Sequence, residues 1–424
     1  MFSKKAFLTA FLFILFISLY LYYSGLAPIL PYKKEQTPKD THISKEVKEN
    51  KPKNSSNTEK PKDICKAYRD TYFTELVKKR EKPENPQKII GYQNNKFGLY
   101  IYRVDDFARK AAEMVNSNGG DWGYVLVPYN VKDYDVKKWN SFFKVLNEYH
   151  LIPIIQLWDV SEDRDKARKE TEKSAEFLNS LNWPIKNRYI SVYNEANDSK
   201  FWKGGANPKE YAWILNKTIK IYKEVNPDFF ILNGAFNASA RGGNGYIDEE
   251  QFLIEMDKAE PGVLKKLDGW ASHPYPHIRG YLGDPYDTGR ASIRGYEWEL
   301  SLLKKYFQID NIPVFITETG WPHAEGKKYR NDYYPEEKVA EYYKIAFEKV
   351  WLPDERVVAV TPFTIKYDPP FDNFSFIKRD GDVYKQFNVL KSMPKIAGRP
   401  PLVEKYDPLK EKCLRIIEQE TKSK

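Results

Sequence analysis

The stretch WGYVLVPYNVKDYDVKKWNSFFKVLNEYHLIPIIQLW, residues 122–158, decides the fold. It opens with an apolar run from Trp122 that is rich in residues typical of strands, and a second such run follows from Ile152. Between the two runs, VKKWNSFFKVLNEY has the apolar spacing of an amphipathic helix. This order predicts a βαβ unit, whose continuous apolar strands suit a parallel sheet that is buried on both faces.

The same alternation continues on both sides of this stretch. Six further strand-like runs are FGLYIY from Phe97, RYISVYNE from Arg188, FFILNGAF from Phe229, LDGWASHPY from Leu267, IPVFITETG from Ile312 and VVAVTPFTI from Val357. Further helical candidates are DDFARKAAEMVNS, KEYAWILNKTIKIYKEV, EEKVAEYYKIAFEKV and YKQFNVLKSM. Eight strands that alternate with helices predict an α/β fold of the closed (β/α)8 TIM-barrel type. The rival, a doubly wound open sheet, would need a GxGxxG motif or a P-loop at its first βα turn, and the sequence has neither.

The amino-terminal end has the composition of a membrane anchor. Residues 6–23 carry no charge and are long enough to span a bilayer, with Lys4 and Lys5 in front of them. The segment lacks a clear A-x-A cleavage site. We therefore expect residues 1–30 to form an uncleaved transmembrane signal anchor, with a cleaved signal peptide as the alternative. Both predict that the rest of the chain is exported, to the cell surface or envelope.

Residues 31–62 are rich in Lys, Glu, Asn, Ser, Thr and Pro and have almost no large apolar residues. Such a segment buries too little surface to offset its ordering entropy, so we predict a disordered, flexible tether. The folded domain is expected over residues 63–424, with its core at about 89–396. Cys65 and Cys413, the two cysteines of the chain, lie near the ends of this domain. Two free thiols, one disulfide between the domain ends or a chance pair are all open.

The charge pattern argues against a nucleic-acid partner. The formal charge is +9, but 68 basic and 59 acidic residues are scattered along the chain without a long block of one sign. Aromatic residues reach 15% of the chain, with 31 Tyr and 10 Trp. These side chains fill cores, and they also supply flat faces for sugar rings. Composition is thus compatible with carbohydrate binding without establishing it.

Two predicted strands end in a carboxylate. The fourth run ends in Asn194 and Glu195, and the seventh reaches Glu318 within TETGWP. In a TIM barrel the carboxyl ends of all strands face the catalytic mouth. A helix cap or buried ion pair would explain one such residue, but two at the same rim favour a functional site, since burying a carboxylate is costly.

These motifs resemble those of glycoside hydrolase clan A, the retaining (β/α)8 glycosidases. Within the clan they are most similar to those of families 39 and 5. The resemblance covers residues 89–396 and implies that Glu195 is the general acid/base and Glu318 the nucleophile. It implies that Asn194 holds the sugar 2-hydroxyl. Clan members often carry a His and a Tyr after strand six, which would match His273 as a ligand of substrate or of Glu195, and Tyr275 as a donor to Glu318.

The sequence departs from the clan at strand eight, where members usually have a Trp platform under the sugar. This chain has TPFTIKY at residues 361–367. Phe363 or Tyr367 would have to replace that platform, or Trp321 or Trp158 would. The clan pattern therefore leaves the substrate undefined.

No arrangement of His, Cys and carboxylates in the sequence has metal-ligand spacing, so no metal and no cofactor are expected. His277 and His323 are weaker candidates for the site. The leading expectation is a glycosidase acting on an envelope or extracellular polysaccharide or oligosaccharide, with room for an acidic one. Two alternatives are a transglycosylase that uses the same two glutamates and a non-catalytic glycan-binding protein on an inactive barrel.

Overall fold

The computed structural model describes residues 65–66, 68–69, 89–102, 107–202, 204–277, 280–403 and 408–422. All of them belong to one compact unit, Asp63–Lys424. The predicted signal anchor of residues 1–30 and the predicted tether of residues 31–62 lie outside the described residues. Among the described helices, none combines the length and the apolar character that a bilayer span requires.

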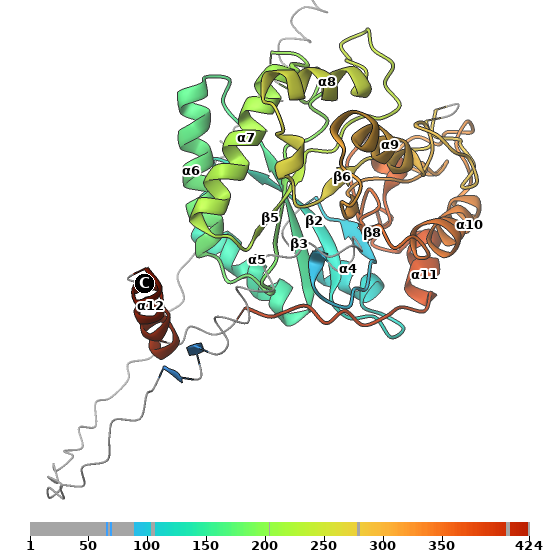
Figure 1. The fold of residues 1–424 in the computed structure, drawn as a ribbon. Helices are drawn as coiled ribbons and strands as arrows, with labels where there is room; N and C mark the ends of the chain where they lie inside the picture. The colour runs from blue at the N-terminus through green and yellow to red at the C-terminus, as the bar shows by residue number, and fades with distance from the viewer. Residues whose placement is uncertain are drawn as a thin grey trace, which may run out of the picture. The chain divides into compact units, whose positions relative to one another are not determined.

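Parallel strands lie at the centre of the unit (Figure 1), and the described residues contain eight of them. They are β1 (Gly98–Tyr100), β2 (Gly123–Asn130), β3 (Leu151–Trp158), β4 (Arg188–Val192), β5 (Phe229–Asn233), β6 (Trp270–Ser272), β7 (Val314–Ile316) and β8 (Val357–Val360). Strands β1 to β5 pair in sequence order, and so do β6 to β8. Parallel bridges join the two sheets, from Phe97 to Val360 and from Leu232 to Gly269. The strands thus close into a ring, as expected for a (β/α)8 barrel.

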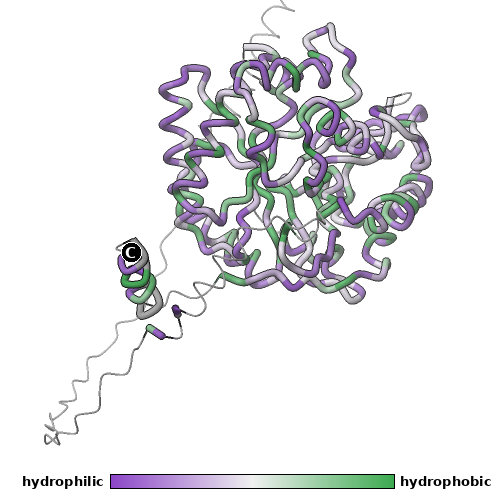
Figure 2. Tube along the Cα trace, in the orientation of Figure 1, coloured by the Kyte–Doolittle hydropathy of each residue, from purple (hydrophilic) through white to green (hydrophobic). Residues whose placement is uncertain are grey.

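A helix follows each strand and packs outside the ring (Figure 1). The helices are α4 (Phe107–Val115), α5 (Val136–Glu148), α6 (Arg164–Ser180), α7 (Pro208–Val225), α8 (Glu249–Ala259), α9 (Gly295–Phe307), α10 (Glu336–Ala346) and α11 (Lys385–Ser392), with short helical turns at Leu264–Lys266, Phe347–Trp351 and Asp372–Phe374. In α5, the Asp135 carboxylate caps the first turn by accepting from the Lys138 amide. The buried residues of α5 recur with helical spacing and face the sheet. Figure 2 shows the resulting pattern, with hydrophobic residues concentrated on the strands.

The barrel interior is blocked at the end where the strands begin. The Tyr92 hydroxyl, just before β1, makes hydrogen bonds of 2.9 Å to the Tyr124 hydroxyl and 2.8 Å to that of Tyr189. Apolar side chains such as Leu126 and Phe315 fill the interior above them. The opposite end, where the strands terminate, carries the polar residues of the site.

The two cysteines form a disulfide between Cys65 and Cys413, so the alternative of a bond between the domain ends is the one that the structure contains. Cys413 belongs to α12 (Pro408–Lys422). An ion pair between Arg69 and Glu420 accompanies the disulfide. Segments 348 residues apart in the chain are therefore joined covalently.

Candidate active site

Three turns at the carboxyl ends of strands carry the central residues. The turn after β4 holds Asn194 and Glu195, the turn after β6 holds His273, and the turn after β7 holds Glu318. The β4 turn is unusually sharp, because Glu195 has φ +36° and donates its amide to the Ala235 carbonyl at 2.9 Å. Close backbone approach explains Gly234, where a Cβ would meet the Val192 carbonyl at 2.3 Å.

The β7 turn is held from both sides. The Thr319 hydroxyl donates to the Pro274 carbonyl at 2.9 Å, and the Phe363 amide donates to the Thr319 carbonyl at 3.0 Å. The next residue, Gly320, has φ +142°, and a Cβ there would meet the Tyr343 hydroxyl at 2.1 Å. Only glycine fits this position. The backbone that carries Glu318 is thus held by the turns after β6 and β8 and packs closely against α10.

The carboxylates of Glu195 and Glu318 both lie next to the imidazole of His273. His273 Nδ1 lies 3.0 Å from Glu195 Oε1 and 3.8 Å from Glu318 Oε2. The two carboxylate oxygens are therefore no farther apart than the sum of these distances, about 6.8 Å. Tyr275 donates its hydroxyl to Glu318 Oε2 at 3.1 Å, which is the hydrogen bond expected from the sequence. Each glutamate retains 8% exposure, so the pair is enclosed but still reaches the surface.

Burial and mutual charge control protonation of this cluster. Burial raises the pKa of Glu318, and Glu195 raises it further, against the lowering effects of His273, Tyr275 and Gln156. Burial lowers the pKa of His273, but the charges of Glu318 and Glu195 outweigh it, so that this pKa is raised. The cluster therefore favours keeping a proton, because two buried carboxylates close together resist full ionisation.

Gln156 is a site residue that the sequence interpretation missed. It lies on β3, is fully buried, and donates to Asn194 Oδ1 at 2.9 Å while it accepts from the Trp158 indole at 2.9 Å. Its amide also lies close enough to Glu318 to lower the pKa of that carboxylate. Gln156 thus holds Asn194 and Trp158 by hydrogen bonds beside Glu318. Its signal in the sequence was a single polar residue within the apolar run IPIIQLW.

An open cavity of about 200 Å³ lies over the two glutamates, and we call it the catalytic cavity. The expected site residues that line it are Asn194, Glu195, Glu318, Tyr275, Trp158, Phe363 and Tyr367. The rings of Phe363 and Tyr367 lie 5.2 Å apart between centroids. An aromatic surface therefore occupies the place where the clan has its strand-eight Trp.

Trp321 corrects one expectation, since it does not line the catalytic cavity. Its ring is 1% exposed, packs against Tyr342 and Tyr343 of α10, and donates to the Gly283 carbonyl. The backbone at Gly320 turns it into the core, where it cannot stack on a sugar.

The three histidines considered as site residues lie in different surroundings. His273 is buried beneath the glutamates, and its Nδ1 faces both of them. His277 lines the catalytic cavity, and burial lowers its pKa to about 4, so it is neutral at physiological pH. His323 is buried and contacts the Ser375 carbonyl through Nε2 at 3.0 Å, away from this cavity. Within the part of the chain that the structure describes, no group of three or more His, Cys, Asp or Glu residues could hold a metal ion.

No family model and no curated protein sequence matches this chain. Among solved structures, a monomeric β-xylosidase from Caulobacter crescentus is similar at 16% identity and a TM-score of 0.50, over 70% of this chain and 67% of the other. An endo-β-1,3-glucanase of family GH128 from Pseudomonas viridiflava matches at 15% identity and a TM-score of 0.45, over 70% and 98%. A family 51 α-L-arabinofuranosidase from Bifidobacterium longum matches at 11% identity and a TM-score of 0.48, over 72% of each chain. Of these structures, the β-xylosidase shares its fold with this chain.

Proposed function

We propose that this protein is a retaining glycoside hydrolase that cleaves O-glycosidic bonds by double displacement. The observation that carries the proposal is the approach of Glu195 and Glu318 to within about 6.8 Å across His273. Retaining glycosidases hold their two carboxyl groups about 5–5.5 Å apart, whereas inverting enzymes need about 6.5–9.5 Å to admit a water molecule. The limit of about 6.8 Å holds for the two oxygens that face His273, and this close approach supports the retaining assignment.

The proposed reaction has two steps, and both use Glu195 and Glu318. In the first, Glu195 gives its proton to the glycosidic oxygen while a Glu318 oxygen bonds to the anomeric carbon and the leaving sugar departs. In the second, Glu195 takes a proton from water, the water oxygen bonds to the same carbon, and the bond to Glu318 breaks. Two inversions give net retention of configuration.

The surroundings of the two glutamates support this division of roles. Glu318 receives a hydrogen bond from Tyr275, which favours the ionised form that a nucleophile needs against the burial that raises its pKa. Glu195 contacts the His273 imidazole at 3.0 Å. Asn194, oriented by Gln156, is suited to bind the sugar 2-hydroxyl.

A non-catalytic role accounts poorly for these contacts. An inactive glycan-binding barrel would gain nothing from two enclosed carboxylates next to each other, because both their burial and their repulsion are unfavourable. Catalysis needs both groups at this separation.

We further propose that the enzyme is anchored in a membrane and faces the outside of the cell. The support is the uncharged segment of residues 6–23 behind Lys4 and Lys5, followed by the polar composition of residues 31–62. This location would bring the site next to envelope or extracellular polysaccharides.

The test is a screen of the purified full chain against aryl glycosides and polysaccharides. Hydrolysis of at least one substrate is expected, and Glu318→Gln should lower it by roughly a thousandfold or more. Glu341→Gln, on the exposed face of α10, is the matched control and should keep full activity. An unchanged rate in Glu318→Gln would remove the nucleophile assignment.

A further inference from the structure

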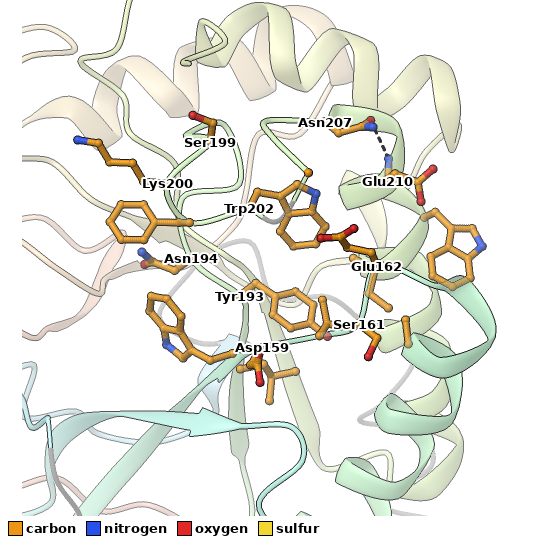
Figure 3. Close-up of a pocket in the computed structure, with 18 residues that line it drawn as sticks. Asp159, Ser161, Glu162, Tyr193, Asn194, Ser199, Lys200, Trp202, Asn207 and Glu210 are labelled. Carbon is orange, nitrogen blue, oxygen red and sulfur yellow. Dashed lines mark hydrogen bonds between the residues drawn. The ribbon is translucent and has the colours of Figure 1, made fainter. Parts of the chain in front are cut away.

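A larger hollow adjoins the catalytic cavity (Figure 3). It has about 580 Å³ of space between the loop after β3, residues 158–162, and the loop after β4 that leads into α7. Tyr193, Trp202 and Glu162 lie around it in Figure 3. Tyr193 and Trp202 are buried, and the more exposed Trp158, Phe201 and Trp213 give the hollow its aromatic lining. We call it the outer hollow. Aromatic faces combined with carboxylates and amides are the groups that bind sugar rings and their hydroxyls.

The outer hollow and the catalytic cavity share a wall. Trp158, Asn194, Lys200 and Phe201 line both. The rings of Trp158 and Phe201 lie 6.2 Å apart and meet nearly edge to face. Because Asn194 is adjacent to Glu195 in the chain, this shared wall stands directly beside the catalytic pair.

A second hollow adjoins the catalytic cavity at a different set of residues. This hollow, which we call the glycine-loop hollow, is lined by residues 239–244 and reaches into the catalytic cavity through shared residues. The residues that line both are Asn237, Tyr246, His277 and Tyr281. The two outer spaces share no lining residue, so each adjoins the catalytic cavity at a different set of residues.

The charge of the three hollows restricts the polymer they suit. Their lining contains six carboxylates, namely Asp159, Glu162, Asp198, Glu210, Glu195 and Glu318, and two cations, Lys200 and Arg241. Asp159 and Glu210 are paired with Lys132 and Arg164. The excess of negative charge is therefore at the catalytic cavity, where it disfavours an anionic sugar, whereas carboxylates accept hydrogen bonds from sugar hydroxyls.

We propose that the three hollows form one groove that binds an internal segment of an uncharged polysaccharide, so that the enzyme cleaves within the polymer rather than at its ends. This inference rests on the proposed glycosidase function. A chain-end enzyme needs a blocked pocket on one side of the cleaved bond, whereas here a further hollow adjoins the catalytic cavity at each of two separate sets of residues. Phe201 and Tyr246 would contact the polymer in the two extensions.

The test uses the full chain with β-1,3-glucan, β-1,4-xylan and β-1,4-mannan, and with polygalacturonate as the anionic comparison. Internal cleavage predicts that viscosity falls early relative to the release of reducing ends, and that oligosaccharides appear before monosaccharides. Release of monosaccharides alone, or a preference for polygalacturonate, would overturn the inference while leaving the glycosidase function intact. Failure to hydrolyse any polymer or aryl glycoside would instead overturn both.

Variants test the two places where the extensions meet the catalytic cavity, since Phe201 and Tyr246 line both the cavity and one extension each. Phe201→Ala and Tyr246→Ala should each lower kcat/KM for the polymer about 3- to 10-fold relative to kcat/KM for an aryl glycoside, as expected for the loss of one aromatic contact. Tyr329→Ala, which removes a 74% exposed ring outside these hollows, is the matched control and should leave this ratio unchanged. An unchanged ratio in both groove variants would show that the polymer does not enter the extensions.

Discussion

Removal of the Tyr275 hydroxyl offers a sensitive test of how the nucleophile is kept ionised. In Tyr275→Phe, Glu318 loses a donor at 3.1 Å, while His273 and Gln156 remain beside it. Hydrogen bonds to charged groups contribute about 1.5–3 kcal/mol, and at this length we take the lower end. A loss of about 1.5 kcal/mol in transition-state stabilisation lowers kcat/KM by about tenfold.

The pH profile should change as well. The Tyr275 hydrogen bond lowers the pKa of Glu318, so its removal raises that pKa and requires a higher pH for the ionised nucleophile. The acid limb of kcat/KM should therefore move toward higher pH, measured with any aryl glycoside that the screen identifies. Tyr222→Phe removes another buried hydroxyl, bonded to Ser174 at 2.8 Å, and should leave the acid limb in place. An unaltered rate and acid limb in Tyr275→Phe would refute this role.

Three further changes probe the acid/base group, the β7 turn and the disulfide. Glu195→Ala should lose activity and recover it with added azide on activated aryl glycosides, and no recovery would weaken the acid/base role. Gly320→Ala should lower the free energy of unfolding by about 2–4 kcal/mol, since the strain of a positive φ adds to the clash of its Cβ with a buried tyrosine. Gly204→Ala has the strain but open space around it and should cost about 1 kcal/mol, so equal thermal shifts would contradict the packing argument. Reduction of the Cys65–Cys413 disulfide should lower the free energy of unfolding by about 2–4 kcal/mol. A melting temperature that does not respond to reductant would contradict this expectation. Cys413→Ser, which has no disulfide to reduce, is the control whose melting temperature should not change with reductant.

The barrel was predictable because its signals are local. Each apolar run contains or overlaps an observed strand, and the helical spacing in residues 136–149 places Trp139 and Phe142 against the sheet as expected. The carboxylates at 195 and 318 were found for a related reason, since the ends of parallel strands share one rim.

Other parts of the site depend on side-chain directions and loop shapes that one sequence does not encode visibly. Trp321 follows a glycine whose φ of +142° turns the ring into the core, although the motif suggested a platform. Gln156 on β3 donates to Asn194 after the neighbouring strand β4 and lies close to Glu318 after β7, a relation that exists only once the barrel is closed. Phe201 reaches the groove through the conformation of the loop after β4.

The central claim is that Glu195 and Glu318 flank a single anomeric carbon as acid/base and nucleophile. Mass spectrometry of the full chain after treatment with a set of activated 2-deoxy-2-fluoro glycosides tests it most directly, because these reagents trap the covalent glycosyl enzyme. The account predicts one glycosyl adduct, on the peptide that contains Glu318, and none in Glu318→Gln. An adduct on a different residue, or turnover with inverted anomeric configuration and no adduct, would contradict it.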